Sequence, residues 1–235
     1  MAVKAVQSVD NALFILEQLA VEQPVGVSEL SRLTGLDKMA VQRVLVTLGQ
    51  RGWIRQVDDS NGQWELTAVP MRVGEQYAAA LREAGRDHLR RLAEASGETA
   101  LLFRRDGNRL VVIDGIDSAQ MVRMTVPIGT EAPMMRGGGL DAFLSADERD
   151  ALPPSEHPMS AAAMRSTSRN GYFVLDSMYP HASAVGAPVW SRSTGTNTVG
   201  GVVIVVGPRE RIAAASTARL GAIVRDVAAA ISATS

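Results

Sequence analysis

Hydrophobic positions near the start of the chain recur at the three- and four-residue spacing of a half-buried helix. The apolar stripe from Val9 to Ala20 predicts a first helix, and Ser8 precedes it as a suitable N-cap. The run Gln23-Pro24-Val25-Gly26 is typical of a break, so we expect this helix to end before it.

The next segment predicts a short helix, a tight turn and a second helix. Ser28 is the expected cap of the short helix, and Gly35 suits the turn because glycine tolerates a positive φ. Asp37 is the expected cap of the following helix, Lys38 to Gln50, where its carboxylate also meets the positive end of the helix dipole. This order is typical of a helix-turn-helix, whose second helix can lie in the DNA major groove.

The helix from Lys38 to Gln50 has one apolar and one polar side. The predicted inner positions are Val41, Val44, Leu45 and Leu48. The predicted outer positions are Lys38, Met39, Gln42, Arg43 and Val46. Glutamine can pair bidentately with adenine and arginine with guanine, so Gln42 and Arg43 are the candidate base-reading residues, with Met39 beside them.

Two short apolar-polar segments follow, residues 53–57 and 63–67. They flank a polar loop that ends in Asn61-Gly62, a strong signal for a β-hairpin. Three helices and a hairpin predict a winged helix-turn-helix. Candidate contacts to the DNA backbone are Lys4, Lys38, Arg55 and, in the wing, Ser60 and Asn61.

Charge argues against this interpretation. Residues 1–70 contain six Lys or Arg and eight Asp or Glu, and the whole chain has a formal net charge of −1. DNA affinity depends on cations near phosphates, so the positive groups must share one face or be doubled by a second copy of the chain. The alternative is a small helical domain that binds protein and whose polar face is only solvated.

The rest of the chain predicts an α+β fold. Residues 70–84 predict a helix, and a second helix is expected between Gly85 and Gly97. Strands are expected at residues 99–104, 110–115, 121–128, 172–175, 185–190 and 200–206, and helices after Ser145, at 160–170 and at 209–233. Strands that arrive as hairpins, with helices grouped between and after them, favour an antiparallel sheet.

Composition narrows the class of protein. The chain has 235 residues, 46% of them hydrophobic, and no cysteine, so neither a disulfide framework nor a thiolate metal site is expected. No apolar run reaches the ~20 residues of a membrane span, and no signal-peptide core is apparent. We expect a cytoplasmic protein without metal, cofactor or membrane partner.

Several segments together resemble the IclR family of bacterial transcription regulators. They are residues 6–13, the helix-turn-helix of residues 30–47, Gly171-Tyr172, Ala187-Pro188-Val189 and Gly207-Pro208. The resemblance implies a winged helix-turn-helix at residues 1–69, a linker helix at 70–85, and a GAF-like α/β effector domain at 86–235. It also implies homodimers, often paired into tetramers, that bind a palindromic double-stranded DNA operator, most commonly as repressors of catabolic operons.

The glycine-containing stretch at residues 128–140 is the candidate ligand site. Three successive glycines before a helical pattern could leave backbone N–H groups open for an anion or a polar ligand atom, although a flexible loop fits the composition equally well. The resemblance implies one wall of an effector pocket here. Where the family often has Gly-Lys, this chain has Leu140-Asp141.

Further departures from the family indicate a more apolar pocket. The candidate effector-binding residues are Met134, Met135, Arg136, Gly137, Gly138, Gly139, Asp176, Met178, Ser183, Ala184 and Ile204. We expect an aromatic or similarly apolar small molecule, with its polar head at Gly137 and Gly138. Alternatively, these apolar side chains simply fill the core.

Catalysis is the competing class of function. No Gly-x-Ser-x-Gly elbow, His-x-x-x-His pair or Gly-x-Gly-x-x-Gly loop is present. Asp176, His181 and Ser183 are close in sequence and could form a hydrolase triad, but closeness in sequence is not triad geometry. We expect no enzyme. A sensor or scaffold whose N-terminal domain binds protein stays open as an alternative.

Overall fold

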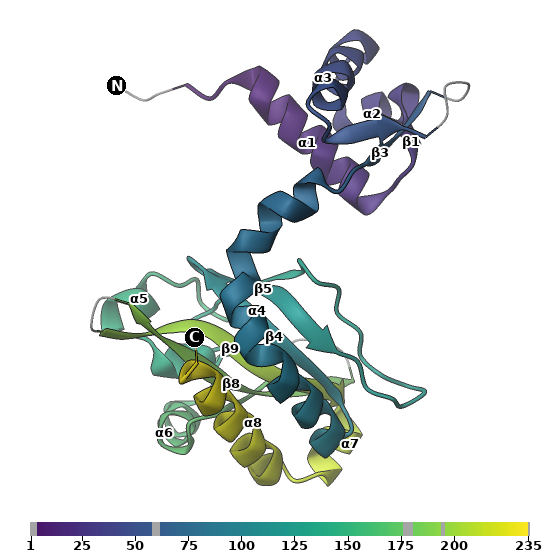
Figure 1. Ribbon diagram of the computed structural model, residues 1–235. Helices are drawn as coiled ribbons and strands as arrows, with labels where there is room; N and C mark the ends of the chain where they lie inside the picture. Colours follow the sequence, from purple (N-terminus) through teal and green to yellow (C-terminus); the bar gives the residue numbers. More distant parts are fainter. Residues whose placement is uncertain (1–3, 58–61, 176–180, 194–195, 235) are drawn as a thin grey trace. The chain divides into compact units, whose positions relative to one another are not determined.

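The computed structural model describes residues 4–57, 62–175, 181–193 and 196–234. The chain divides into two compact units, Met1–Tyr77 and Ala78–Ser235 (Figure 1). The N-terminal unit has the element order α1 (Gln7–Val21), β1 (Val25–Gly26), α2 (Val27–Thr34), α3 (Lys38–Gln50), β2 (Ile54–Gln56) and β3 (Gln63–Leu66).

The three helices of this unit enclose one small apolar core. Its fully buried members come from each of them and include Ile15, Leu19, Leu30, Val41 and Leu45. The strands form an antiparallel sheet in the order β1-β3-β2, in which Trp64 of β3 faces the same core. The predicted helix-turn-helix and hairpin strands are therefore confirmed, and the two-residue strand β1 is an addition to them.

Two predicted helix caps are wrong. Ser8 lies inside α1, whose N-cap is Val6, and Ser28 lies inside α2, whose N-cap is Gly26. Neither N-cap residue donates or accepts a side-chain capping hydrogen bond. Both helices start two residues earlier than these caps predicted, and packing of Ile15 and Leu30 in the core stabilises them without a polar cap.

Helix α4 (Val69–Ser96) is continuous through Gly85, where the sequence predicted a break. Gly85 is buried, and a Cβ atom on it would lie 2.5 Å from Leu102 Cδ2 and 3.7 Å from Ile231 Cδ1. The glycine therefore allows the helix to approach β4 and α8 closely. Residues from both units belong to this one helix.

The C-terminal unit contains a six-stranded antiparallel sheet in the order β6-β5-β4-β9-β8-β7. Its elements are β4 (Thr99–Asp106), β5 (Arg109–Ile116), β6 (Glu131–Pro133), the 3-10 helix η1 (Leu140–Phe143), α5 (Ala146–Asp150), α6 (Ala161–Asn170), β7 (Phe173–Leu175), β8 (Ala182–Ser193), β9 (Thr196–Pro208), α7 (Arg209–Ala214) and α8 (Thr217–Ser232). The predicted α+β class with an antiparallel sheet is confirmed.

Two predicted elements of this unit are wrong. Residues 121–128 form no strand, and Met121 is 96% exposed. This segment is fixed instead at single points, such as the hydrogen bond from Thr99 Oγ1 to the carbonyl oxygen of Met124. The closing helix is split into α7 and α8 because Ser216 has a φ of 63°.

The sheet has two differently covered faces. Helices α4 and α8 lie side by side over one face, as the contacts of Gly85 with Leu102 and Ile231 show (Figure 1). Alternate residues of β4, such as Leu101 and Phe103, point to the opposite face and pack in a second apolar cluster with Met134 and Leu140. The loops and short helices between β5 and β7 cover this second face.

Candidate functional site

The turn before α3 is held by side chains that the sequence marks for it. Gly35 has a φ of 70°, and Asp37 Oδ1 accepts a hydrogen bond of 2.8 Å from the backbone N–H of Ala40. Ser31 Oγ donates to the carbonyl oxygen of Leu36 at 2.6 Å. These contacts fix where α3 begins, so the residues of its first two turns have defined directions.

Helix α3 has the two faces that its sequence predicts. Val41, Leu45 and Leu48 are buried. The exposed side carries Lys38, Met39, Gln42, Arg43 and Val46. Met39 is 70% exposed, although it is apolar. An exposed helix face that carries amide, guanidinium and apolar groups has the chemistry for contacts with base edges.

The hairpin beside α3 carries one of the candidate phosphate contacts. Arg55 lies opposite Glu65 in the β2–β3 ladder, and Arg55 Nε donates to Glu65 Oε1 at 2.7 Å. This guanidinium is therefore already engaged with a carboxylate, although most of it is exposed. Lys4 is exposed, and Ser60 and Asn61 lie outside the described residues.

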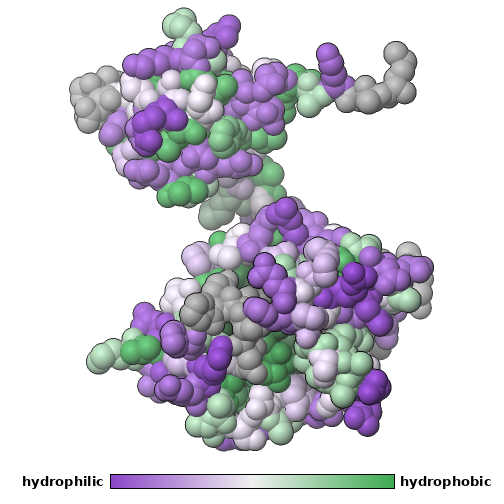
Figure 2. Space-filling model, turned by 180° about the vertical axis from the view of Figure 1, so that it is seen from behind, coloured by the Kyte–Doolittle hydropathy of each residue, from purple (hydrophilic) through white to green (hydrophobic). Residues whose placement is uncertain are grey.

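The C-terminal unit contains a cavity of about 510 Å³ on the sheet face opposite to α4 and α8. Figure 2 shows apolar residues reaching the surface in the central part of this unit's visible face. The lining consists of Leu101, Phe103, Leu110, Met124, Val126, Thr130, Ala132, Pro133, Met134, Met135, Gly137, Gly138, Leu140, Ser155, Glu156, His157, Met159, Phe173, Val174, Leu175, Ala182, Ser183, Ala184, Ile204 and Val206. A cavity of this size and apolar character is suited to a small organic molecule.

Most of the predicted effector residues come together at this cavity. Met134, Met135, Gly137, Gly138, Ser183, Ala184 and Ile204 belong to its lining. Arg136 and Gly139 are not among the lining residues, and Asp176 and Met178 lie outside the described residues. Whether the cavity binds a ligand stays a prediction.

The expectation of open N–H groups at the three glycines is wrong. The N–H of Gly137 donates to Asp141 Oδ2 at 2.7 Å, and that of Gly139 donates to Asp141 Oδ1 at 3.0 Å. The N–H of Gly138 donates to the carbonyl oxygen of Met135 at 3.2 Å. Asp141 is only 2% exposed, so its carboxylate occupies the place that we expected a ligand's polar head to take.

Sequence reasoning missed several strand residues of the lining. Ser183, Ala184 and Ile204 were expected, but Leu101 and Phe103 of β4, Phe173 of β7 and Val206 of β9 were not. Their alternation along each strand was a usable signal, because residues two apart point to the same face. Asp141 stands two residues after the last glycine, and this position was the sequence signal that its carboxylate could accept from the glycine N–H groups.

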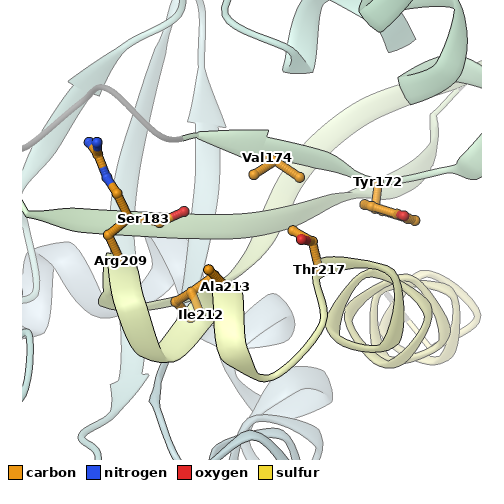
Figure 3. A pocket seen from close by; sticks show the side chains of 7 residues that line it. All are labelled: Tyr172, Val174, Ser183, Arg209, Ile212, Ala213 and Thr217. Carbon is orange, nitrogen blue, oxygen red and sulfur yellow. The ribbon is translucent and has the colours of Figure 1, made fainter.

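A second, smaller hollow of about 290 Å³ lies where β7 and β8 meet α7 and α8 (Figure 3). Its lining residues are Tyr172, Val174, Ser183, Arg209, Ile212, Ala213 and Thr217. Ser183 belongs to the lining of both cavities. This hollow was not foreseen from the sequence.

The described residues give no support to the triad. His181 is exposed and has a φ of 63°, Ser183 is buried, and Asp176 is not described. Among the described residues, no group of three or more His, Cys, Asp or Glu is placed to hold a metal ion. No helix among the residues that the structure describes is long and apolar enough to cross a membrane.

Two domain models of one protein family match this chain, one in each unit. The model of the IclR helix-turn-helix domain matches residues 8–58, and the model of the bacterial transcriptional regulator IclR C-terminal domain matches residues 77–155. The acetate operon repressor of Salmonella typhimurium is 36% identical over 146 residues, which are 60% of this chain and 53% of that protein. The chain thus spans about half the length of this relative.

Solved structures agree in fold. HmgR of Pseudomonas aeruginosa is 24% identical and has a TM-score of 0.75, covering 97% of this chain and 98% of that one. An IclR homolog from Microbacterium hydrocarbonoxydans, complexed with 4-hydroxybenzoate, is 18% identical with a TM-score of 0.75 and the same coverage. Because domain models match in both units, and together over more than half of its residues, the chain belongs to the IclR family of bacterial transcriptional regulators.

Proposed function

We propose that this protein is a ligand-responsive transcription regulator that binds a palindromic operator, most simply as a repressor of a catabolic operon. The exposed face of α3, with Gln42 and Arg43 on a helix fixed by the Asp37 cap, carries the proposal. In this proposal α3 enters the major groove, where Gln42 and Arg43 contact bases. Lys4, Lys38, Arg55 and the wing residues Ser60 and Asn61 contact the backbone.

An apolar stripe on the N-terminal unit supports self-association. Val6, Val9 and Leu13 recur at helical spacing and are 62%, 54% and 55% exposed. Such a stripe is unfavourable in water, and a second copy of the chain can cover it with the same stripe. A two-fold dimer, or a pair of dimers, would present to the DNA twice the few cations of one chain. It would also require DNA half-sites one helical turn or a multiple apart.

The cavity of the C-terminal unit is the proposed effector site. Its lining residues belong to the C-terminal unit and α3 belongs to the N-terminal unit, so we propose that ligand binding acts on DNA affinity by coupling. A coupling free energy of ~1–3 kcal/mol changes operator affinity 5- to 150-fold. An aromatic ligand is reasonable because the lining is largely apolar and because the Microbacterium relative was crystallised with 4-hydroxybenzoate.

Fluorescence anisotropy with DNA from upstream of the gene tests the proposal. We expect saturable binding that survives excess nonspecific competitor, and a fall in affinity when the cavity is filled. Binding that nonspecific DNA abolishes at equal concentration would contradict the regulator function. It would favour instead an N-terminal unit that binds protein.

A further inference from the structure

The three glycines at residues 137–139 are the part of the cavity wall that is best able to bind an anion. Backbone N–H groups at glycines before a helical turn commonly hold carboxylates or phosphates. In this protein each of the three N–H groups already has an acceptor. The acceptors are both carboxylate oxygens of Asp141 and the carbonyl oxygen of Met135.

Asp141 supplies the acceptors for two of these three N–H groups. Its side chain is almost completely buried, and the turn from Gly137 to Gly139 closes around it. A carboxylate ligand could accept from the N–H groups of Gly137 and Gly139 only by displacing this side chain. Burying either carboxylate without partners is strongly unfavourable.

The described residues of the remaining lining include no Lys or Arg that could pair with a carboxylate. Asp141 lies behind the wall and is not itself among the lining residues. The polar lining groups are the side chains of Thr130, Ser155, Glu156, His157 and Ser183. Hydroxyl groups can serve an alcohol, phenol, ketone or amide, which need only one or two hydrogen bonds.

From these contacts we infer that the effector is an uncharged apolar molecule, and that Asp141 is the residue that excludes carboxylates. The inference rests on the proposed effector function and narrows its ligand class. Asp141 acts through the glycine turn and does not line the cavity itself, so it is a positioning residue. The inference separates this chain's ligand class from that of the relative crystallised with 4-hydroxybenzoate, which is a carboxylate.

Calorimetry on the full chain with matched ligand pairs tests the inference. The probes are benzoate against benzamide, phenylacetate against phenylacetamide, and 4-hydroxybenzoate against 4-hydroxybenzamide. We expect at least one amide to bind, and to bind at least tenfold more tightly than its carboxylate. Equal or tighter binding of the carboxylates would overturn the inference and leave the proposed effector site standing.

Two variants separate the role of Asp141 from a purely structural one. Asp141→Asn removes the charge and one acceptor oxygen, so we expect the amide-to-carboxylate affinity ratio to fall at least tenfold. Asp147→Asn, the same change at an exposed residue outside the lining, should keep the ratio of the wild type. A folded Asp141→Asn protein with an unchanged ratio would refute its role.

Absence of binding by every probe would have a different meaning. It would count against the cavity as an effector site, and so against both the proposed function and this inference. If Asp141→Asn unfolds, the wild-type ratio alone decides the ligand class. Asp141→Glu then tests the residue, because a longer carboxylate that still accepts both N–H groups should keep the amide preference.

Discussion

Arg211 binds Glu98 through two parallel contacts, Nε to Oε1 at 2.5 Å and Nη2 to Oε2 at 2.7 Å. The Glu98 side chain is 6% exposed, so this ion pair joins α7 to the segment before β4 in a mostly dry environment. The hydrogen bond to Glu98 raises the pKa of the Arg211 guanidinium above its usual value. The Arg211 guanidinium therefore stays charged over the normal pH range.

Glu98→Gln should therefore destabilise the C-terminal unit by about 1–3 kcal/mol, because Arg211 loses its charged partner while an amide stays buried. Urea unfolding followed by circular dichroism measures the change. Glu131→Gln, which removes the exposed pair between Arg109 and Glu131, should cost less than about 1 kcal/mol. Equal losses in the two variants would show that burial of Glu98 does not matter.

Protonation of Glu148 should also lower the stability of the folded protein in acid. Hydrogen bonds from Ser145 in the capping box, and then from Arg105, hold the pKa of Glu148 below its ordinary 4.5. The group therefore stabilises the fold fully above pH 4.5 and loses this contribution as pH falls through the lower pKa of the folded state.

We expect Glu148→Gln to flatten the acid limb of the stability profile, with melting temperatures measured between pH 3 and pH 7. The variant should differ most from the wild type at neutral pH and least at pH 3. A difference in melting temperature that stays constant from pH 3 to pH 7 would contradict the lowered pKa of Glu148.

Arg43→Ala tests the base-reading face of α3. If Arg43 contacts a base, specific affinity falls by about 1–3 kcal/mol, and discrimination against altered half-sites falls with it. Anisotropy titrations with the operator and with point-mutated operators measure both effects. Arg219→Ala, at an exposed position of α8, should leave both values unchanged; a similar loss there would indicate a nonspecific charge effect.

Glu65→Gln tests the proposed contact of Arg55 with the DNA backbone. Because Glu65 engages the Arg55 guanidinium and itself repels phosphates, its neutralisation should raise DNA affinity and make the log–log salt slope steeper by about 1. Affinity that stays the same, or falls, with the hairpin intact would place Arg55 away from the DNA backbone.

Ala184→Phe tests the cavity. Ala184 lies on β8 in the cavity lining, so a phenyl group there should fill much of the space and abolish the response to ligand while sparing operator binding. Ala229→Phe, at an exposed position of α8, is the control. A response of normal size in Ala184→Phe would move the effector site elsewhere, and the 290 Å³ hollow beside α7 would be the next candidate.

The sequence predicted most of the N-terminal unit because its signals are local. Asp37 caps α3 by accepting a hydrogen bond from the N–H of Ala40, three residues further on. Gly35 adopts its positive φ in the tight turn directly before α3. The break predicted at Gly85 failed because that glycine serves a distant contact with Leu102. The split at Ser216 was missed because no glycine or proline marks it.

The candidate site was predicted only in part because much of it is formed by residues that are distant in the sequence. The three glycines drew attention to residues 128–140, but the acceptor for the N–H groups of Gly137 and Gly139 is decided by how Asp141 folds back on the turn. The strand residues Phe173 and Val206 join the cavity only when β7 and β9 enter one sheet. Pairing over such distances is not encoded in local spacing.

Footprinting of the purified protein on the DNA upstream of its gene decides whether the chain binds an operator. We expect a protected segment with two-fold symmetry, half-sites about one helical turn or a multiple apart, and loss of protection with Arg43→Ala. Uniform or absent protection by well-folded protein, with and without the uncharged aromatic probes, would contradict it.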